Sequence, residues 1–322
     1  MALVTGCSDS DSTDDVHSVY YWRTSFAVSD DAARWMKEQN VSRMYMRLFD
    51  VVEADNDEGG RPVATITFRD SVPEDLTIIP VVFIRNEAIA GMKDMNGFCD
   101  KLLKRIDDIT RKNGMGICQE VQIDCDWTRS TRDSYFALLK ALAGKLHGEG
   151  RLLSTTIRLH QLDQDAPPVD RGVLMLYNTG NFRDANEENS ILSSQSAEPY
   201  FSRFAGYGLP LSLALPDFGW NVVFRDGKFA QIVQNANLAD TSLYRLTDKD
   251  NYVVLSYHNP GANAAVTGEE STLYPFDILR HEESSDSLNQ IMYDKIKSLR
   301  RDVVSEVILY HLHDNPRQVF PQ

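Results

Sequence analysis

The stretch Glu120-Val121-Gln122-Ile123-Asp124-Cys125-Asp126-Trp127 decides the fold prediction. Its pattern is typical of a β-strand, and a helical pattern follows over about residues 131–147. Side chains alternate between the two faces of a strand, so Asp124 and Asp126 point the same way. Two carboxylates on one face of a core strand are costly unless they are paired, hydrogen-bonded or solvated. A strand that ends in a solvated pocket meets this condition.

The same strand-then-helix unit recurs along the chain. Strands are predicted at about residues 16–26, 41–52, 76–84, 120–127, 152–159, 172–178, 208–215 and 303–312. Helices are predicted at about residues 30–40, 95–112, 131–147, 191–204 and 286–301. This alternation predicts an α/β protein, a (β/α)8 TIM barrel. A doubly wound sheet is the alternative, but the count of eight and the polar residues at the strand ends favour the barrel. Pro80 predicts an irregularity in the third strand, because proline loses a hydrogen bond of the sheet.

Residues 217–285 interrupt this alternation. They contain strand-like pieces at about 220–224, 229–233 and 252–257, with turn signals at Asp226-Gly227 and Pro260-Gly261. The sequence therefore predicts one barrel over residues 16–322 with a β-rich insertion after strand seven, at about 217–285.

Charge and composition restrict the class of ligand. The chain of 322 residues has a formal net charge of −14, from 33 basic and 47 acidic residues. A nucleic-acid partner is not expected, because phosphate binding requires a basic face. A neutral or cationic ligand, such as a glycan or oligosaccharide, is compatible with this charge, although solubility alone also accounts for it. None of the four cysteines has CxxC spacing, and no apolar run reaches the length of about 18 residues that a membrane span needs.

The N-terminal residues give an expectation about location. Val4-Thr5-Gly6-Cys7 resembles a bacterial lipobox, in which the cysteine is lipidated. Six residues are fewer than the charged and apolar regions of an export signal need, so either the start is truncated or the match is chance. Residues 8–15 hold four aspartates, three serines and no basic residue, which is typical of a disordered tether and resembles the export signal of surface lipoproteins in Bacteroidetes-like bacteria. We expect a protein of the bacterial cell envelope, at the outer membrane or cell surface, that contacts the membrane only through a lipid on Cys7.

Polar and aromatic residues gather at the predicted C-terminal ends of the strands, where barrels of this kind carry their sites. Asp124, Asp126 and Tyr177 are the candidate catalytic residues. The candidate substrate-binding residues are Trp22, Arg47, Trp127, Arg158, His160, Asn178, Asp217, Trp220 and His311. Flat aromatic rings beside carboxylates and arginines suit a sugar, because ring faces stack and hydroxyl groups need polar partners. The alternative is structural: residues at strand ends also cap loops and form ion pairs.

Two other chemistries receive less support. His311 and His313 share a face of strand eight, but the sequence marks no third metal ligand, so neither a metal nor another cofactor is predicted. A Ser-His-Asp mechanism lacks the GxSxG motif that would support it.

The stretch Ile123-Asp124-Cys125-Asp126-Trp127, with the helix that carries Tyr135-Phe136-Ala137-Leu138, resembles strand four of the family-18 glycoside hydrolases, the chitinase-like barrels. The motif of that family is Asp-Gly-x-Asp-x-Asp-Trp-Glu. Leu174-Met175-Leu176-Tyr177-Asn178 resembles the family's Met-x-Tyr-Asp on strand six. The resemblance implies that Asp126 supports an acetamido nucleophile and that Tyr177 assists it.

The chain departs from that motif at two of its acidic positions. Val121 stands where the family has its first aspartate, and Thr128 stands where the family has its catalytic glutamate, the general acid. Two hypotheses follow. In the first, the protein hydrolyses glycans, and Asp50, Asp217 or Asp314 supplies the acid. In the second, it is a relative that binds glycans without cleaving them. A degenerate barrel that serves as a scaffold for a protein partner is a third possibility.

Overall fold

The computed structural model describes residues 15–54, 60–90, 92, 94–234, 236–260, 271–300, 305–316 and 318–322. Cys7 and all of the proposed lipobox and tether except Asp15 lie outside these residues, as does Gly261. No helix in the described ranges is long and apolar enough to span a membrane.

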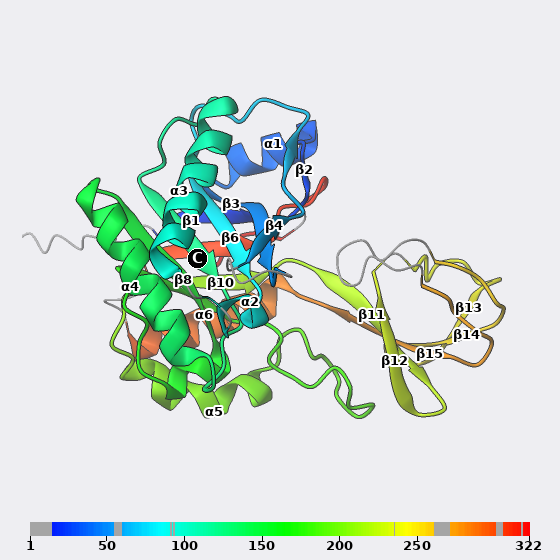
Figure 1. Cartoon of the computed structure of the whole chain (residues 1–322). Coiled ribbons are helices and arrows are strands. Elements are labelled where there is room, and N and C mark those ends of the chain that lie inside the picture. Colours follow the sequence, from blue (N-terminus) through cyan, green and yellow to red (C-terminus); the bar gives the residue numbers. More distant parts are fainter. Residues whose placement is uncertain are drawn as a thin grey trace, which may run out of the picture.

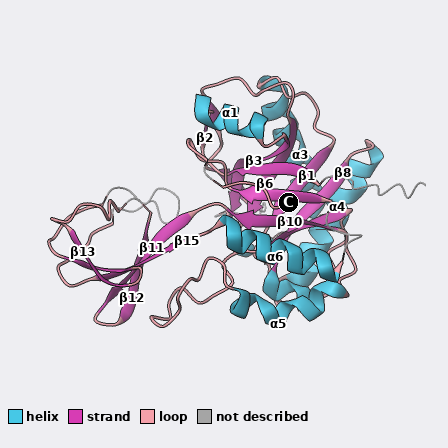
Figure 2. Cartoon of the chain, turned by 180° about the vertical axis from the view of Figure 1, so that it is seen from behind, coloured by secondary structure: helices cyan, strands magenta, loops and turns pink. Residues whose placement is uncertain are grey.

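Eight parallel strands close into a barrel, which confirms the predicted fold class (Figures 1 and 2). The barrel strands are β1 (Val16–Tyr21), β3 (Val41–Val52), β6 (Thr77–Ile84), β7 (Glu120–Asp124), β8 (Leu152–Arg158), β9 (Arg171–Met175), β10 (Leu211–Pro216) and β16 (Glu306–Tyr310). They follow the order β1-β16-β10-β9-β8-β7-β6-β3, and the pairing of β1 with β3 closes the circle. β4 (Arg61–Val63) adds an antiparallel strand to β3, and β2 (Ser25–Phe26) pairs with β5 (Thr67–Phe68).

Helices surround the barrel, but not after every strand. They are α1 (Asp30–Glu38), α2 (Asn86–Ala90), α3 (Met95–Lys112), α4 (Arg132–Gly148), α5 (Ser194–Ala205) and α6 (Asp286–Leu299). A 3₁₀ turn, η1 (Leu159–Asp163), follows β8. The described residues between β3 and β6 form extended and turn structure, without a helix. This part of the barrel wall is therefore covered by an extended segment instead of a helix.

The insertion is an antiparallel sheet between β10 and α6. Its strands are β11 (Gly219–Arg225), β12 (Lys228–Val233), β13 (Tyr244–Asp248), β14 (Asn251–Val254) and β15 (Ile278–Glu283). Figure 1 shows this sheet projecting from one side of the barrel, with β11 and β15 leading out to it. It has a small apolar core of its own, which includes Val223, Tyr244 and Leu279. The predicted β-rich insertion after strand seven is thus confirmed.

Side chains that point into the barrel form layers, because residues alternate along each strand. A polar floor lies near the strand N-termini, where Arg171 contacts Glu120 at 2.8 Å and Glu306 at 2.6 Å. Burial opposes ionisation of Glu306, but Arg171 and the hydroxyl groups of Ser18 and Ser212 outweigh it and lower its pKa. Above this floor lies an apolar layer of Tyr20, Tyr45, Ile79, Val81, Val173, Met175, Ala214 and Ile308. The side chains of the candidate site follow at the C-terminal ends.

One local prediction about the strands was wrong. Pro80 pairs with Met46 in regular register, so β6 has no irregularity at the proline. The register shift lies in the neighbouring strand, between Arg47 and Phe49 of β3. A bulge adds one residue to a strand and interrupts the alternation of faces. It brings Asp50 to the side of Arg47, and the two side chains form an ion pair at the barrel mouth.

Candidate functional site

The site begins with the register between β7 and β8. Gln122 lies opposite Ser154 and Ile123 lies opposite Thr155. The next inward-pointing residues are therefore Asp124 on β7 and Thr156 on β8. The hydroxyl of Thr156 donates a hydrogen bond of 2.5 Å to Asp124 Oδ1. The pairing of two parallel strands thus places a hydrogen-bond donor directly beside the buried carboxylate.

Arg158, two residues beyond Thr156, bridges both aspartates of the motif. Its Nη2 donates to Asp124 Oδ1 at 3.0 Å, and its Nε donates to Asp126 Oδ1 at 2.5 Å. Asp124 is buried, whereas the Asp126 side chain is 56% exposed. Both carboxylates lie on the same side of the β7 segment, as their spacing predicted, but they share one cation. The strand itself ends at Asp124, three residues earlier than predicted.

The electrostatics of this triad are those of a closed ion-pair cluster. Burial raises the pKa of Asp124; Arg158 lowers it, and the charge of Asp126 raises it. Burial opposes the charge of Arg158, but the two carboxylates outweigh it and raise the pKa of the guanidinium. Arg158 Nη1 is buried without a hydrogen-bond partner among the residues that the structure describes. Arg158 therefore stays positively charged, and one of its nitrogens has no hydrogen-bond partner among the described residues.

Thr128, at the position of the family's catalytic glutamate, belongs to the turn that begins α4. Its backbone N–H donates to Thr131 Oγ1 at 3.0 Å, and its hydroxyl lies 2.8 Å from Ser130 Oγ. Thr131 Oγ1 in turn donates to Asn86 Oδ1 at 2.5 Å. Thr128 is exposed and carries no titratable group, so it cannot give a proton to a leaving group at neutral pH.

The carboxylates proposed as a substitute acid are engaged elsewhere. Asp50 is held by Arg47, and the side chains of the pair are 14% and 11% exposed. Asp314 forms an ion pair of 2.6 Å with Arg23, and its own side chain is 69% exposed. Each of these two carboxylates is therefore paired with an arginine, although the charge of Asp50 still contributes to raising the pKa of Asp124.

Asp217 lies at the end of β10 but beside α6. Burial first, and then the charge of Asp286 in the first turn of α6, raise its pKa to about 7. Its backbone N–H donates to the carbonyl of Tyr310 at 2.5 Å, and its own carbonyl accepts from His313 Nε2. Leu215, two residues before Asp217, belongs to the apolar layer outside the barrel, whereas Ala214 belongs to the inner one. Asp217 therefore has the pKa of a possible acid, but the charge that helps to raise it is that of Asp286 on the outer helix α6.

A cluster of partly exposed aromatic rings lies beside the triad. Tyr177 stacks on Tyr310 with ring centroids 4.9 Å apart, and Trp22 contacts Tyr310 at 5.8 Å. Phe218 contacts Tyr177 at 5.8 Å and Trp220 at 5.4 Å. We call these five rings (Trp22, Tyr177, Phe218, Trp220 and Tyr310) the aromatic cluster; each is partly exposed. It extends from the barrel mouth onto the first strand of the insertion.

The insertion side of this cluster is fixed by a buried carboxylate. Glu282 accepts hydrogen bonds from Trp220 Nε1 at 2.9 Å and from Ser190 Oγ at 2.5 Å. Arg280 Nε donates to the same residue at 2.6 Å. Arg280 also reaches the carbonyls of Phe182 and Asp184, so the loop after β9 is tied to the insertion.

The remaining candidates occupy different environments. Trp127 is 0% exposed and packs on Tyr135 and Phe136 in the layer between barrel and helices, so it presents no ring face to a ligand. His160 and Asn178 are exposed, and Asn178 has a positive φ of 53°. Burial lowers the pKa of His311 to about 3. The described residues include no group of three or more His, Cys, Asp or Glu side chains that could hold a metal ion.

Sequence reasoning missed three residues of the site: Thr156, Phe218 and Tyr310. Tyr310 is the last residue of β16 and points the same way as Ile308 of the inner layer. The predicted strand ran on to residue 312, which assigned His311 to the strand end instead. The alternation of faces identifies both Tyr310 and Thr156 once the strand ends are known.

Comparison with known proteins gives structural but not sequence relatives. No family model matches the sequence, and no curated protein matches it either. The spore cortex-lytic enzyme SleL of Bacillus megaterium QM B1551 has a TM-score of 0.56 and 11% identity, over 95% of this chain and 72% of that one. SleL of Bacillus cereus gives 0.54 and 12%, over 94% and 72%. A chitinase from Chromobacterium violaceum gives 0.53 and 11%, over 92% and 94%. The chain thus has the fold of the chitinase-like barrels that its β7 motif resembles.

Proposed function

We propose that this protein binds a glycan at the mouth of a chitinase-like barrel and does not cleave it. The observation that carries the proposal is the bridge from Arg158 to both Asp124 and Asp126. In a substrate-assisted mechanism, the supporting aspartate must be free to interact with the acetamido group of the sugar. Here that aspartate is paired with a cation, and the position of the acid holds Thr128.

The fold and the aromatic cluster support a carbohydrate ligand. The structurally similar proteins are named as chitinases and spore cortex-lytic enzymes. Aromatic side chains bind the apolar faces of sugar rings, and buried polar groups fix the orientation of the hydroxyl groups. Tyr177 lies close enough to Arg158 to act on its charge, and Trp22 joins the same cluster through Tyr310. Arg158 Nη1 is buried without a partner among the described residues, so a sugar hydroxyl or an acetamido oxygen would accept from it once a movement of the side chain exposes it.

A hydrolytic function receives less support. The two hydrolytic geometries place a second carboxyl group roughly 5 to 10 Å from the first, with an acid form available at neutral pH. Asp217 has a pKa of about 7, but the charge that acts on it is that of Asp286 in α6. Of the other two candidates, Asp50 is paired with Arg47 and Asp314 with Arg23, so neither is unpartnered.

The test is a screen of the purified chain on a glycan array, followed by product analysis for every glycan that binds. The array includes N-acetylglucosamine oligomers, because of the names of the structural relatives. We expect binding to at least one glycan class and no new reducing ends. Released product from a bound glycan would restore the hydrolase hypothesis, and the absence of binding to any glycan would favour a scaffold for a protein partner.

We also propose that the protein is attached to the bacterial cell envelope through a lipid on Cys7. The support is the sequence Val4-Thr5-Gly6-Cys7 and the acidic stretch that follows it. Metabolic labelling with an alkyne fatty acid in the bacterium that makes the protein tests this. We expect labelled wild-type protein in the membrane fraction and unlabelled protein from a Cys7→Ala variant. Wild-type protein without label would contradict the proposal.

A further inference from the structure

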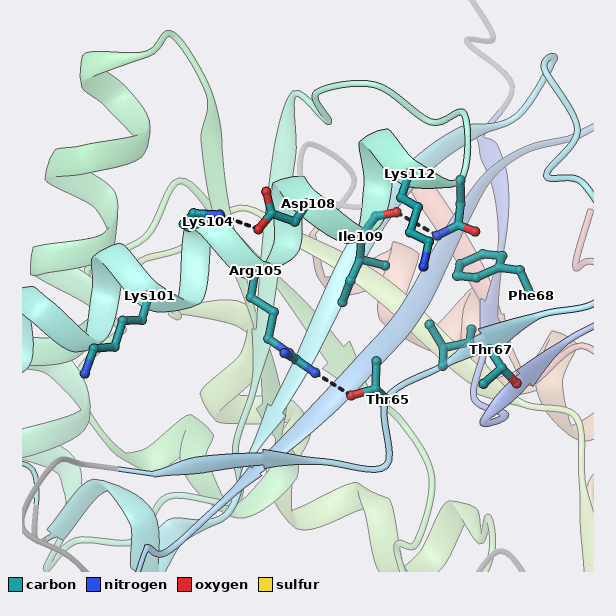
Figure 3. A pocket seen from close by; sticks show the side chains of 11 residues that line it. Thr65, Thr67, Phe68, Lys101, Lys104, Arg105, Asp108, Ile109 and Lys112 are labelled. Atoms are coloured by element: carbon teal, nitrogen blue, oxygen red, sulfur yellow. Dashed lines mark hydrogen bonds and ion pairs between the residues drawn. The ribbon is translucent and has the colours of Figure 1, made fainter.

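A cavity outside the barrel has a composition that the barrel site does not explain. It has a volume of about 600 Å³ and lies between α3 and the extended segment Thr65–Phe68. Its lining residues include Lys101, Lys104, Arg105, Asp108 and Lys112 of α3. Figure 3 shows Arg105 reaching from α3 to Thr65, with Lys112 near Phe68 and with Lys101 and Lys104 further along the helix.

The cavity exists because the barrel has no helix in this place. In a regular (β/α)8 barrel, a helix follows each strand and covers the wall. The described residues between β3 and β6 instead form β4, β5 and turns. The hydrogen bond from Ile66 N–H to the carbonyl of Leu48 holds this segment against β3. An extended segment covers less surface than a helix, so a groove remains beside α3.

The charge of the groove is opposite to that of the protein. Lys101, Lys104, Arg105 and Lys112 supply four positive charges, and Asp108 is the single acid among its lining residues. The protein as a whole carries −14. Positions spaced by three, four and seven residues fall on one side of a helix, so α3 presents these cations together. Asp108 neutralises Lys104 alone, at 2.5 Å.

A second cavity, at the strand N-termini, serves as a comparison. It has a volume of about 700 Å³ and is lined by two arginines, Arg43 and Arg171, among other residues. Both arginines pair with buried glutamates of the barrel floor, at 3.5 Å and 2.6 to 2.8 Å. The charges there are satisfied within the protein, whereas the groove beside α3 keeps an excess of cations.

Arg105 is the partly buried cation of the groove. Its Nη2 donates to Thr65 Oγ1 at 2.8 Å, and its guanidinium lies 5.1 Å from the Phe49 ring centroid. Its Nε is buried and has no hydrogen-bond partner in the described part of the chain. The buried Nε does not reach a ligand in the groove, but the outer nitrogens of a planar guanidinium that is fixed at one side suit a carboxylate or sulfate oxygen. Phe68 and Ile109 add apolar surface to the same groove, which a sugar ring can cover.

We propose that this groove binds the acidic groups of a glycan, a carboxylate of a uronic acid or a sulfate ester. The proposal rests on the proposed function for the identity of the ligand as a glycan, but on a different set of residues. Arg105 and Lys112 contact the anionic group, and Phe68 contacts the sugar ring. The groove then selects acidic glycans, while the barrel mouth binds a part of the glycan that need not be charged.

The experiment measures the affinity of the full chain for a galacturonate hexamer, a heparin-derived hexasaccharide and a neutral N-acetylglucosamine hexamer by calorimetry. The test variants are Lys101→Gln/Lys112→Gln and Arg105→Gln. Lys140→Gln, an exposed position on α4, is the control with the same kind of charge change. We expect at least a tenfold loss of affinity for one acidic hexasaccharide in the test variants, no change in the control, and weaker binding at higher salt. The double variant alters exposed lysines and keeps the assay valid if Arg105→Gln does not fold.

The arms of this experiment separate the possible ligands. Loss confined to the galacturonate hexamer identifies a carboxylate site, and loss confined to the heparin fragment identifies a sulfate site. Equal affinities of Lys101→Gln/Lys112→Gln and Lys140→Gln for both acidic hexasaccharides would overturn the proposal. Free sulfate that binds as tightly as the hexasaccharides would also overturn it. Loss of neutral binding in a Trp22→Ala variant, with acidic binding kept, would show that the two sites fail independently.

Discussion

The guanidinium of Arg158 lies 3.0 Å from Oδ1 of the buried Asp124 and 2.5 Å from Oδ1 of the exposed Asp126. One cation thus pairs with both carboxylates that the sequence marks for chemistry. Asp124, the buried carboxylate, affects the stability of the fold, because a buried charge without a partner is strongly unfavourable. Asp126, the exposed carboxylate, affects function, because it is the carboxylate that a ligand would meet first.

Replacing Arg158 tests the inner pair. We expect Arg158→Met to lower the free energy of unfolding by about 3 kcal/mol at pH 7, because Asp124 is left buried without its cation. Urea denaturation gives this value. The loss should shrink toward pH 4, because the variant's Asp124 has a still higher pKa and takes up a proton. Arg129→Gln, which removes the exposed ion pair with Asp163, is the control and should cost less than about 1 kcal/mol. Equal effects of the two variants would contradict the buried-pair account.

Asp217 should make the protein less stable as pH rises. Its pKa is raised from an ordinary 3.8 to about 7 in the folded protein, so the unfolded state loses this proton first. The protonated Asp217 carboxyl contributes its full stabilisation below pH 4, and this contribution is lost between pH 4 and 7. Above pH 7 the free energy of unfolding no longer changes with the titration of this group. Asp217→Asn removes this effect. We expect a gain on the order of 2 to 4 kcal/mol at pH 7.5 and none at pH 4, from denaturation at both values. An equal effect of the substitution at both pH values would refute the shifted pKa.

The aromatic cluster should carry the affinity for the glycan. Trp22→Ala removes a partly exposed ring whose centroid lies 5.8 Å from that of Tyr310 and which has the Arg47 guanidinium over it at 5.7 Å. The loss of buried apolar area predicts a cost of about 1 to 2 kcal/mol, or roughly tenfold in affinity. Tyr257→Ala, whose ring is 66% exposed on the insertion, is the matched control and should leave the affinity unchanged. Calorimetry on the best ligand of the array measures both. A Trp22→Ala variant with the affinity of the wild type would exclude the cluster from the binding site.

The reactivity of three buried cysteine thiols tests the packing of the core. Cys99, Cys118 and Cys125 are buried and free, and burial raises the pKa of Cys99 and of Cys118 to about 11. A thiol reagent attacks the thiolate, so these cysteines should be inert in the folded protein at pH 8. In a Cys7→Ser variant we expect almost no labelling in buffer and three labelled thiols in urea. Rapid labelling of the folded variant would contradict the packing of α3 and β7 described above.

The sequence predicted the barrel because its signals are local. Apolar strands, amphipathic helices such as α3 and the paired Asp124 and Asp126 each follow from the spacing of a few residues. What it could not predict depends on contacts between distant segments. The bulge in β3 that turns Asp50 toward Arg47 leaves no mark in the sequence. The end of β16 at Tyr310, rather than at residue 312, is set by its pairing with β10.

The role of Arg158 shows the same limit. It was predicted at the site but as a ligand-binding residue, because no spacing rule links position 158 to positions 124 and 126. The register between β7 and β8 creates that link. The groove beside α3 was not predicted at all. It arises because the described residues between β3 and β6 form no helix and because residues 60–70 pack over β3 as an extended segment.

The measurement that tests the central claim most directly is a titration of the purified protein with the best glycan of the array, with the same samples analysed for cleavage products after prolonged incubation. The account predicts saturable binding and an intact glycan at the end. Cleavage products from the wild type that disappear in an Asp126→Ala variant would contradict it, because Asp126 would then be a working catalytic residue despite its bond to Arg158.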